Sequence, residues 1–245
     1  MPNTDNITRL LTRQDIWRGG SQSSTRRTIT TGHKPLDRLL HGGWPVGALT
    51  ELLTQQSGIG ELTLLLPMLR HYSGKEQLCV WLDPPYQPYA PSLAAAGIAL
   101  HRLLIVRSKS PQEWLWAAEQ SIRSGALLCA WNGKQPPRYT ALRKLQLAAS
   151  GSNSAAFLFS SSKTGTAPSP AILRLDVSSH RVNCLSLTLR KLRGNAPGAS
   201  IQLALGEASS QRTMLTQLPV NTLYPQIQES VHRVPIKQPC LQLHT

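Results

Sequence analysis

The sequence lacks any segment that would place it in or across a membrane. No apolar run reaches the length of about eighteen residues that a membrane-spanning helix needs. The N-terminal stretch MPNTDNITRLLTRQD has no apolar core of the kind that a signal peptide carries. The sequence therefore predicts a cytoplasmic location and no membrane partner.

Cysteine is scarce, and the four copies lie far apart, at Cys79, Cys129, Cys184 and Cys240. None has a second cysteine at a zinc-ligand spacing, and the histidines form no ligand pair at helical spacing. The first three cysteines lie in apolar, strand-like runs, where a free thiol packs as a small hydrophobic group. We therefore expect no disulfide framework, no metal site and no bound cofactor.

Acidic residues are also few. The chain carries 12 Asp and Glu against 26 Lys and Arg, which gives a formal net charge of +14 and a pI near 10.3. Such a balance favours polyanions or acidic protein surfaces as partners. A length of 245 residues fits one sizeable core, so one α/β domain with tails is the simplest organisation.

The most informative stretch is ALTELLTQQSGIGELTLLLPML, residues 48–69. It predicts a buried strand over Ala48–Leu53, a tight loop over Thr54–Gly60 and an apolar helix over Glu61–Leu69. This is the layout of a phosphate-binding loop, but that loop needs a Lys for the phosphates and a hydroxyl for Mg²⁺. Those two positions hold Ile59 and Gly60.

The segments on either side carry a family resemblance. The upstream TGHKPLDRLLHGGWPVGALTELL and the downstream QLCVWLDPPYQPYAPSLAAAGI resemble the RecA recombinase family. The degenerate loop residues Ser57, Gly58, Ile59 and Gly60, followed by LLLPML, resemble the SulA/ImuA group of the RecA superfamily, and ImuA most. The resemblance covers roughly residues 12–205. It implies a RecA-like α/β domain with a mostly parallel central sheet, helices on both faces and antiparallel C-terminal strands.

The resemblance also shows what an ATPase site would have needed. The family places a catalytic Glu two residues after Asp83, where this chain has Pro85. It places the Mg²⁺-organising Asp at the end of the strand 126–131, where this chain has Trp131 and Asn132. Because several parts of one site are lost together, we expect no ATPase activity. A working DNA-stimulated ATPase is the disfavoured alternative.

Two segments flank the expected RecA-like domain, which we place at residues 31–205. Residues 1–20 predict a short amphipathic helix, and residues 21–30 a Gly/Ser-rich linker. In RecA filaments an N-terminal helix packs on the neighbouring subunit, so the resemblance makes Leu10, Leu11, Trp17 and Arg18 candidate partner-binding residues. A helix folded back on its own domain is the alternative. The Gln-, Ser- and Pro-rich residues 206–245 predict a flexible tail.

A basic cluster precedes the expected turn at residues 194–198. Arg190, Lys191 and Arg193 are candidates for contact with nucleic acid or an acidic partner, with a solvated hairpin tip as the alternative. Any DNA binding is expected to be electrostatic and indifferent to sequence. Trp44, in the turn GGWPVG, has two possible roles, stacking on a base or structural packing.

The resemblance to ImuA implies a non-enzymatic role. The expected function is that of an adaptor in SOS-induced translesion DNA synthesis, which joins an ImuB-type homologue of Y-family polymerases and an error-prone polymerase, with RecA as a further partner. The alternative is a SulA-type inhibitor of cell division that binds the tubulin-like protein FtsZ. Overexpression separates them, because only the inhibitor would make cells filamentous.

Overall fold

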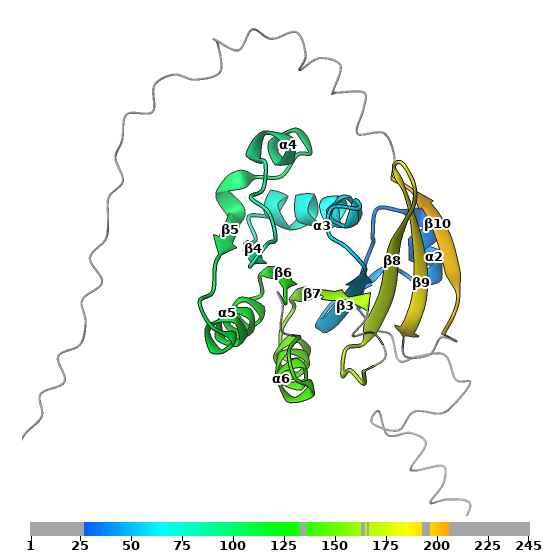
Figure 1. Ribbon diagram of the computed structural model, residues 1–245. Helices are drawn as coiled ribbons and strands as arrows, with labels where there is room; N and C mark the ends of the chain where they lie inside the picture. The colour runs from blue at the N-terminus through cyan, green and yellow to red at the C-terminus, as the bar shows by residue number, and fades with distance from the viewer. Residues whose placement is uncertain (1–26, 133–135, 163–164, 166, 193–196, 206–245) are drawn as a thin grey trace, which may run out of the picture. The chain divides into compact units, whose positions relative to one another are not determined.

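The computed structural model describes residues 27–132, 136–162, 165, 167–192 and 197–205 (Figure 1). The predicted helix with Leu10, Leu11, Trp17 and Arg18 lies outside these residues, and so does the predicted tail. None of the helices in the described ranges has the length and hydropathy that a membrane span requires.

An eight-stranded mixed sheet is the centre of the described fold, with the order β10-β9-β8-β3-β7-β6-β4-β5. Its strands are β3 Ala48–Thr54, β4 Cys79–Leu82, β5 Leu103–Val106, β6 Leu127–Trp131, β7 Ala155–Ser161, β8 Leu173–Arg181, β9 Cys184–Leu192 and β10 Ser200–Ala204. The pairs from β8 through β5 are parallel, and β9 and β10 are antiparallel to their neighbours. The expected α/β class is confirmed, with a mostly parallel sheet and antiparallel C-terminal strands.

Helices cover both faces of this sheet. They are α2 Lys34–Leu39, α3 Glu61–Gly74, α4 Ala90–Ala95, α5 Pro111–Arg123 and α6 Tyr139–Ser150, with a short 3-10 turn, η1, at Leu100–Arg102. Figure 1 shows α3 and α4 on one side of the sheet and α5 and α6 on the other. A two-stranded sheet, β1 Thr28–Ile29 with β2 Trp44–Pro45, lies outside it. Thr28 and Ile29, which the sequence places in the linker, therefore belong to a strand.

Alternation along the strands explains why two cores form. Cys79 and Trp81 of β4 join the cluster under α3, while Val80 and Leu82 join the cluster under α5 and α6. Successive strand residues point to opposite faces, so an uninterrupted apolar strand feeds both cores at once. Trp44 is fully buried and its ring meets Phe157 edge-on at 5.2 Å, which settles its role as packing.

The cysteines behave as predicted in the described part of the chain, where all three are free. Burial raises the pKa of the Cys79 thiol to about 12. Burial also raises the pKa of Cys129 well above its usual value, with a smaller contribution from Cys79. Both thiols therefore serve as packing groups.

Two predicted boundaries differ from the structure. The helix expected to end at Leu69 continues to Gly74 although Pro67 lies inside it, because the flanking residues Leu64, Leu65, Met68 and Leu69 are buried in the core. Pro67 packs where a side chain at Gly32 would stand, since a methyl group there would lie 2.5 Å from the Pro67 Cβ. The apolar run HRLLIVRS, residues 101–108, predicts a longer strand than β5. A 3-10 turn occupies its start, and after β5 Ser108 donates its N–H to the Asp83 carboxylate and leaves the ladder.

Candidate functional site

The loop that resembles a phosphate-binding loop joins β3 to α3. Every residue of β3 is buried, and the loop then turns through Gly58 and Gly60, at φ values of 86° and 101°. Only glycine adopts this left-handed backbone at little cost. The predicted strand, loop and helix are all present, and Ser57 and Gly58 are exposed at the tip.

A carboxylate of the chain itself fills part of the loop. The N–H of Gly58 lies 2.9 Å from Oε1 and 3.1 Å from Oε2 of Glu61, whose side chain is 4% exposed. In a nucleotide site these backbone N–H groups bind phosphate oxygens. Glu61, the first residue of α3, supplies an internal anion in that role and would repel a second one. In the sequence Glu61 stands only at the start of a predicted helix, and nothing there shows its contact with Gly58.

The two lost positions are closed by packing as well. Ile59, at the Lys position, packs against the hydrophobic core instead of reaching toward the loop opening. Gly60, at the hydroxyl position, faces the C-terminal strands. A methyl group on it would lie 2.8 Å from Cδ1 of Leu205, which follows β10. A Ser or Thr at Gly60 would therefore strain the backbone, which has a φ of 101°, and would force the Leu205 side chain to move.

The strand ends next to the loop hold aromatic rings instead of metal ligands. Trp131 stacks on Phe159 with ring centres 4.5 Å apart and an interplanar angle of 5°, and Trp81 meets Trp131 edge-on at 5.9 Å. Asn132 donates from its amide to the hydroxyl of Ser160 at 2.9 Å. Among the described residues no group of three His, Cys, Asp or Glu side chains could hold a metal ion.

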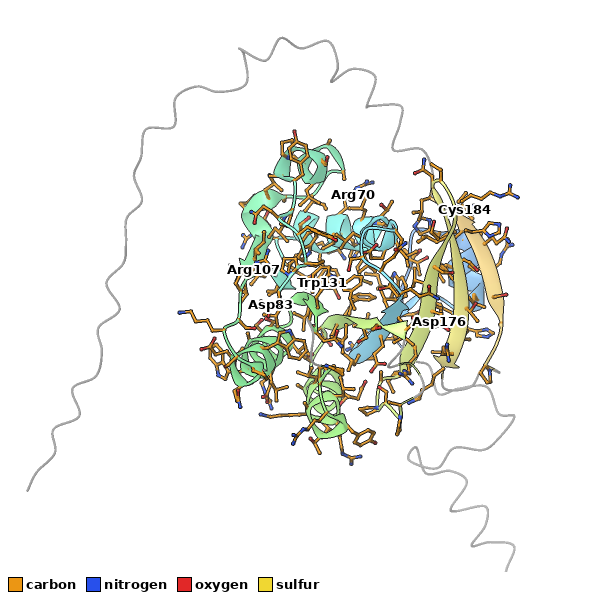
Figure 2. The ribbon with its side chains drawn as sticks, in the orientation of Figure 1. Arg70, Asp83, Arg107, Trp131, Asp176 and Cys184 are labelled. Atoms are coloured by element: carbon orange, nitrogen blue, oxygen red, sulfur yellow. The ribbon has the colours of Figure 1, made fainter. Side chains whose placement is uncertain are left out.

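Asp83, at the end of β4, is hydrogen-bonded to the segment that follows β5. It has a φ of 51°, and its carboxylate accepts the N–H of Ser108 at 2.7 Å and also the Ser108 hydroxyl. Pro85 is exposed two residues later and carries no proton-accepting side chain. Figure 2 shows Asp83 close to Arg107 and Trp131 at this end of the sheet.

A buried ion pair holds β3 against β8. Arg174 Nε lies 2.7 Å from Glu51 Oε2, and the two side chains are 10% and 3% exposed. Ser169 donates its hydroxyl to the other oxygen of Glu51, and Arg174 also donates to the carbonyl of Ala167 at 3.0 Å. The carboxylate and the guanidinium are thus both hydrogen-bonded as burial requires.

The predicted basic cluster is largely used inside the protein. Arg190 forms an ion pair with Asp176, and Lys191 donates to the carbonyl of Ser169 at 2.7 Å. Burial, followed by the charge of Arg174, lowers the pKa of Lys191, while Glu51 opposes that shift. Arg193 lies outside the described residues. Arg190 and Lys191 therefore have structural contacts near β8 and β9, and the sequence could not show these contacts.

A pocket of about 800 Å³ opens at a different part of the same sheet edge. It lies at the carboxyl ends of β4 and β6, next to the first turns of α5 and α6. Its lining comes from four short segments, namely Asp83, Ser108–Leu115, Trp131–Asn132 and Pro136–Ala141. Within these segments Glu113 and Tyr139 do not line the pocket. Ligands of open α/β sheets commonly bind outside the carboxyl ends of the strands. Residue spacing gave no sign of this pocket.

Acidic side chains in the described part of the chain all have partners within it. These are Asp37, Glu51, Glu61, Glu76, Asp83, Glu113, Glu119 and Asp176, each of which accepts a hydrogen bond from a nearby donor. Lys and Arg are more numerous there, so most exposed charge is positive. The described surface therefore carries the positive excess that the composition predicts.

Comparisons with known proteins give one partial similarity. No family model matches the chain. The cell division inhibitor SulA of Edwardsiella piscicida is 30% identical over 89 residues, a stretch that covers 35% of this chain and 51% of the relative. The chain thus spans about half the length of the curated relative that it matches. Over about a third of its own length, then, the chain is similar to SulA.

Proposed function

We propose that this protein is a non-enzymatic adaptor of DNA-damage tolerance. In this role it would join an ImuB-type polymerase homologue to an error-prone polymerase during SOS-induced translesion synthesis in the cytoplasm, with RecA as a further partner. The observation that carries the non-enzymatic part is the Glu61 carboxylate on the N–H of Gly58. A protein with this loop would act through the surfaces that it presents to other molecules.

The changes around the loop support one another. Ile59 removes the phosphate-binding charge, Gly60 removes the hydroxyl, and Pro85 removes the base that would activate water. Each of these groups commonly contributes several kcal/mol to phosphoryl transfer. Their combined loss, with an internal anion in the loop, supports a protein that turns over no ATP.

The charge distribution supports a partner-binding role. The exposed surplus of Lys and Arg fits acidic protein surfaces, and it also fits non-specific, salt-sensitive contact with DNA. The damage-tolerance setting rests on the resemblance to the ImuA group that the sequence motifs carry. The similarity to SulA is consistent with that group.

A mutagenesis assay tests the adaptor role. We expect deletion of the gene to lower the frequency of mutations induced by ultraviolet light and the wild-type gene to restore it. The variant Ser57→Ala should restore it equally, because an adaptor needs no catalytic loop. Deletion of residues 1–20, the predicted docking segment, should fail to restore it. An unchanged mutation frequency in the deletion strain would contradict the adaptor role.

A second candidate is a SulA-type inhibitor that binds FtsZ. The observation in its favour is the 30% identity to a protein named as a cell division inhibitor. Overexpression in otherwise undamaged cells distinguishes the two. Filamentous cells, together with direct binding to purified FtsZ, would favour the inhibitor. Normal division with altered damage-induced mutation would favour the adaptor.

A further inference from the structure

The pocket at the carboxyl ends of β4 and β6 combines an apolar floor with a cationic mouth. Trp114 and Leu115 of α5 and Pro137 line it together with Lys109 and Arg138. The ring N–H of Trp114 is anchored on the carbonyl of Trp131 at 2.9 Å, which fixes the indole in place. An apolar side chain can therefore enter a preformed site while an acidic neighbour meets the cations.

Exposed aromatic side chains lie close in sequence to the segments that line this pocket. Tyr86 follows Asp83 by three residues and is 68% exposed, and Trp116 lies one turn after Gln112 and is 65% exposed. Tyr139 adjoins Arg138 and is 46% exposed. Within the described residues, large exposed aromatic rings occur at only one further position, Tyr89. Tyr, Trp and Arg are the residues that most often dominate the energy of protein interfaces.

The acids close to the pocket already accept hydrogen bonds from within the chain. Asp83 is held by Ser108, and Glu113 accepts the N–H of Lys109 at 2.8 Å. Glu119 accepts from Arg123 and lies 2.7 Å from the Nζ of Lys144.

The nearby cations are less occupied. Among the residues that the structure describes, Lys109, Arg138 and Arg143 have no carboxylate within ion-pair distance. All three are exposed. This side of the molecule is thus positive, with aromatic rings between the charges.

We propose that this pocket and its rim form a docking site for an acidic segment of a partner protein, with one apolar side chain of that segment in the pocket. The charge of Lys109, Arg138 and Arg143 selects the acidic partner, and the floor at Trp114 and Leu115 accepts its apolar anchor. A nucleic acid fits less well, because it needs a continuous row of phosphate contacts. Here the carboxylates of Asp83 and Glu113 interrupt the cations.

This inference rests on the proposed function in one respect, namely that the partner is a protein. It goes beyond that proposal in naming the surface and the chemistry of the segment. Because it is tested with purified protein, a failure here is distinguishable from a failure of the mutagenesis assay.

The test uses fluorescence anisotropy with the full-length protein. The probe is a short fluorescein-labelled peptide of Asp, Glu, Leu and Trp, compared with a peptide in which Lys replaces the acids and with labelled oligothymidine. We expect the acidic peptide to bind in preference to both. Lys109→Glu and Arg138→Glu should each weaken binding about tenfold, and Trp116→Ala should weaken it by a similar factor.

Lys75→Glu is the matched control, because it changes the net charge equally. Lys75 is exposed after α3, at the amino end of β4, whereas the pocket lies at the carboxyl end. The control should bind the acidic peptide like the wild type, and all variants should melt like the wild type because every mutated side chain is exposed. Equal weakening by Lys75→Glu would overturn the proposal, as would tighter binding of oligothymidine than of the acidic peptide.

Discussion

Two regions at the carboxyl edge of one sheet have opposite characters. After β3, the loop from Thr54 to Gly60 is closed, since the Glu61 carboxylate meets its N–H group and Leu205 abuts Gly60. After β4 and β6, a pocket of about 800 Å³ is open and has cations at its mouth. In the first region the Gly58 N–H bonds to a carboxylate of the chain itself. In the second region Lys109 and Arg138 line the pocket without a carboxylate ion-pair partner among the described residues.

The two regions differ in which binding groups they leave open, although they share one sheet edge. Both regions are built by parallel strands that end at the same edge, which is where α/β proteins bind ligands. A carboxylate at the start of α3 and the side chain of Leu205 close the loop after β3. The open region has exposed Trp and Tyr rings, which suit a protein surface better than a phosphate.

The largest expected effect comes from the ion pair beneath the closed loop. Arg174→Met leaves the buried Glu51 carboxylate without its cation, and we expect it to lower the free energy of unfolding by about 3–5 kcal/mol. Urea denaturation followed by circular dichroism measures this loss. Glu76→Gln is the control, because the Glu76–Arg102 pair is exposed and should change stability little. Equal effects of both changes would show that the Glu51 pair is not special.

The next effect distinguishes backbone strain from steric closure. Gly58 and Gly60 both have positive φ, but only Gly60 faces a neighbouring side chain, that of Leu205. We expect Gly58→Ala to cost about 1 kcal/mol through strain alone. Gly60→Ala should cost about 1–3 kcal/mol more through overpacking. If the two alanine variants melt together, the C-terminal strands do not close the loop.

A smaller effect is expected when the internal anion is neutralised. Glu61→Gln keeps the shape of the side chain but weakens the bond from the Gly58 N–H, and we expect a loss of about 1–2 kcal/mol. Glu113→Gln is a matched control, because Glu113 accepts a backbone N–H at an exposed site. Thermal denaturation should show the larger change for Glu61→Gln. The reverse order would contradict a structural role for Glu61 in the loop.

The smallest effect is a pH dependence at Glu119, on α5 beyond the open region. Hydrogen bonds from Lys144 and Arg123 lower the pKa of Glu119 from its ordinary value of 4.5. A lowered carboxyl pKa stabilises the fold above that ordinary value, and the gain is lost as the pH falls through the lowered one. The difference in Tm between wild type and Glu119→Gln should therefore shrink on acidification. A difference that is constant with pH would contradict this linkage.

Much of the fold was accessible from the sequence because its signals are local. Unbroken apolar runs such as ALLCAW predict central parallel strands, and the alternation in RVNCLSLTLRKL predicts a strand, which the family resemblance places among antiparallel C-terminal strands. The boundary of α3 was harder to predict, because Pro67 normally ends a helix and only tertiary burial keeps it inside one.

The candidate site was only half accessible from the sequence. The losses at Ile59, Gly60 and Pro85 follow from residue identity alone. The roles of Glu61 and Leu205 depend on contacts in space, and Leu205 lies about 145 residues from the loop in sequence. The pocket was invisible for the same reason, because four separated segments build it. Arg190 and Lys191 could not be distinguished from free surface charges until their partners were known.

Titration of the wild-type protein with a fluorescent ATP analogue and Mg²⁺, paired with a phosphate-release assay, tests the closed loop most directly. We expect no saturable binding and no hydrolysis above background, with or without single-stranded DNA. The double variant Ile59→Lys with Gly60→Thr should also stay inactive, because Glu61, Leu205 and Pro85 remain. Stoichiometric nucleotide binding or DNA-dependent hydrolysis by the wild type would contradict a closed, non-catalytic loop.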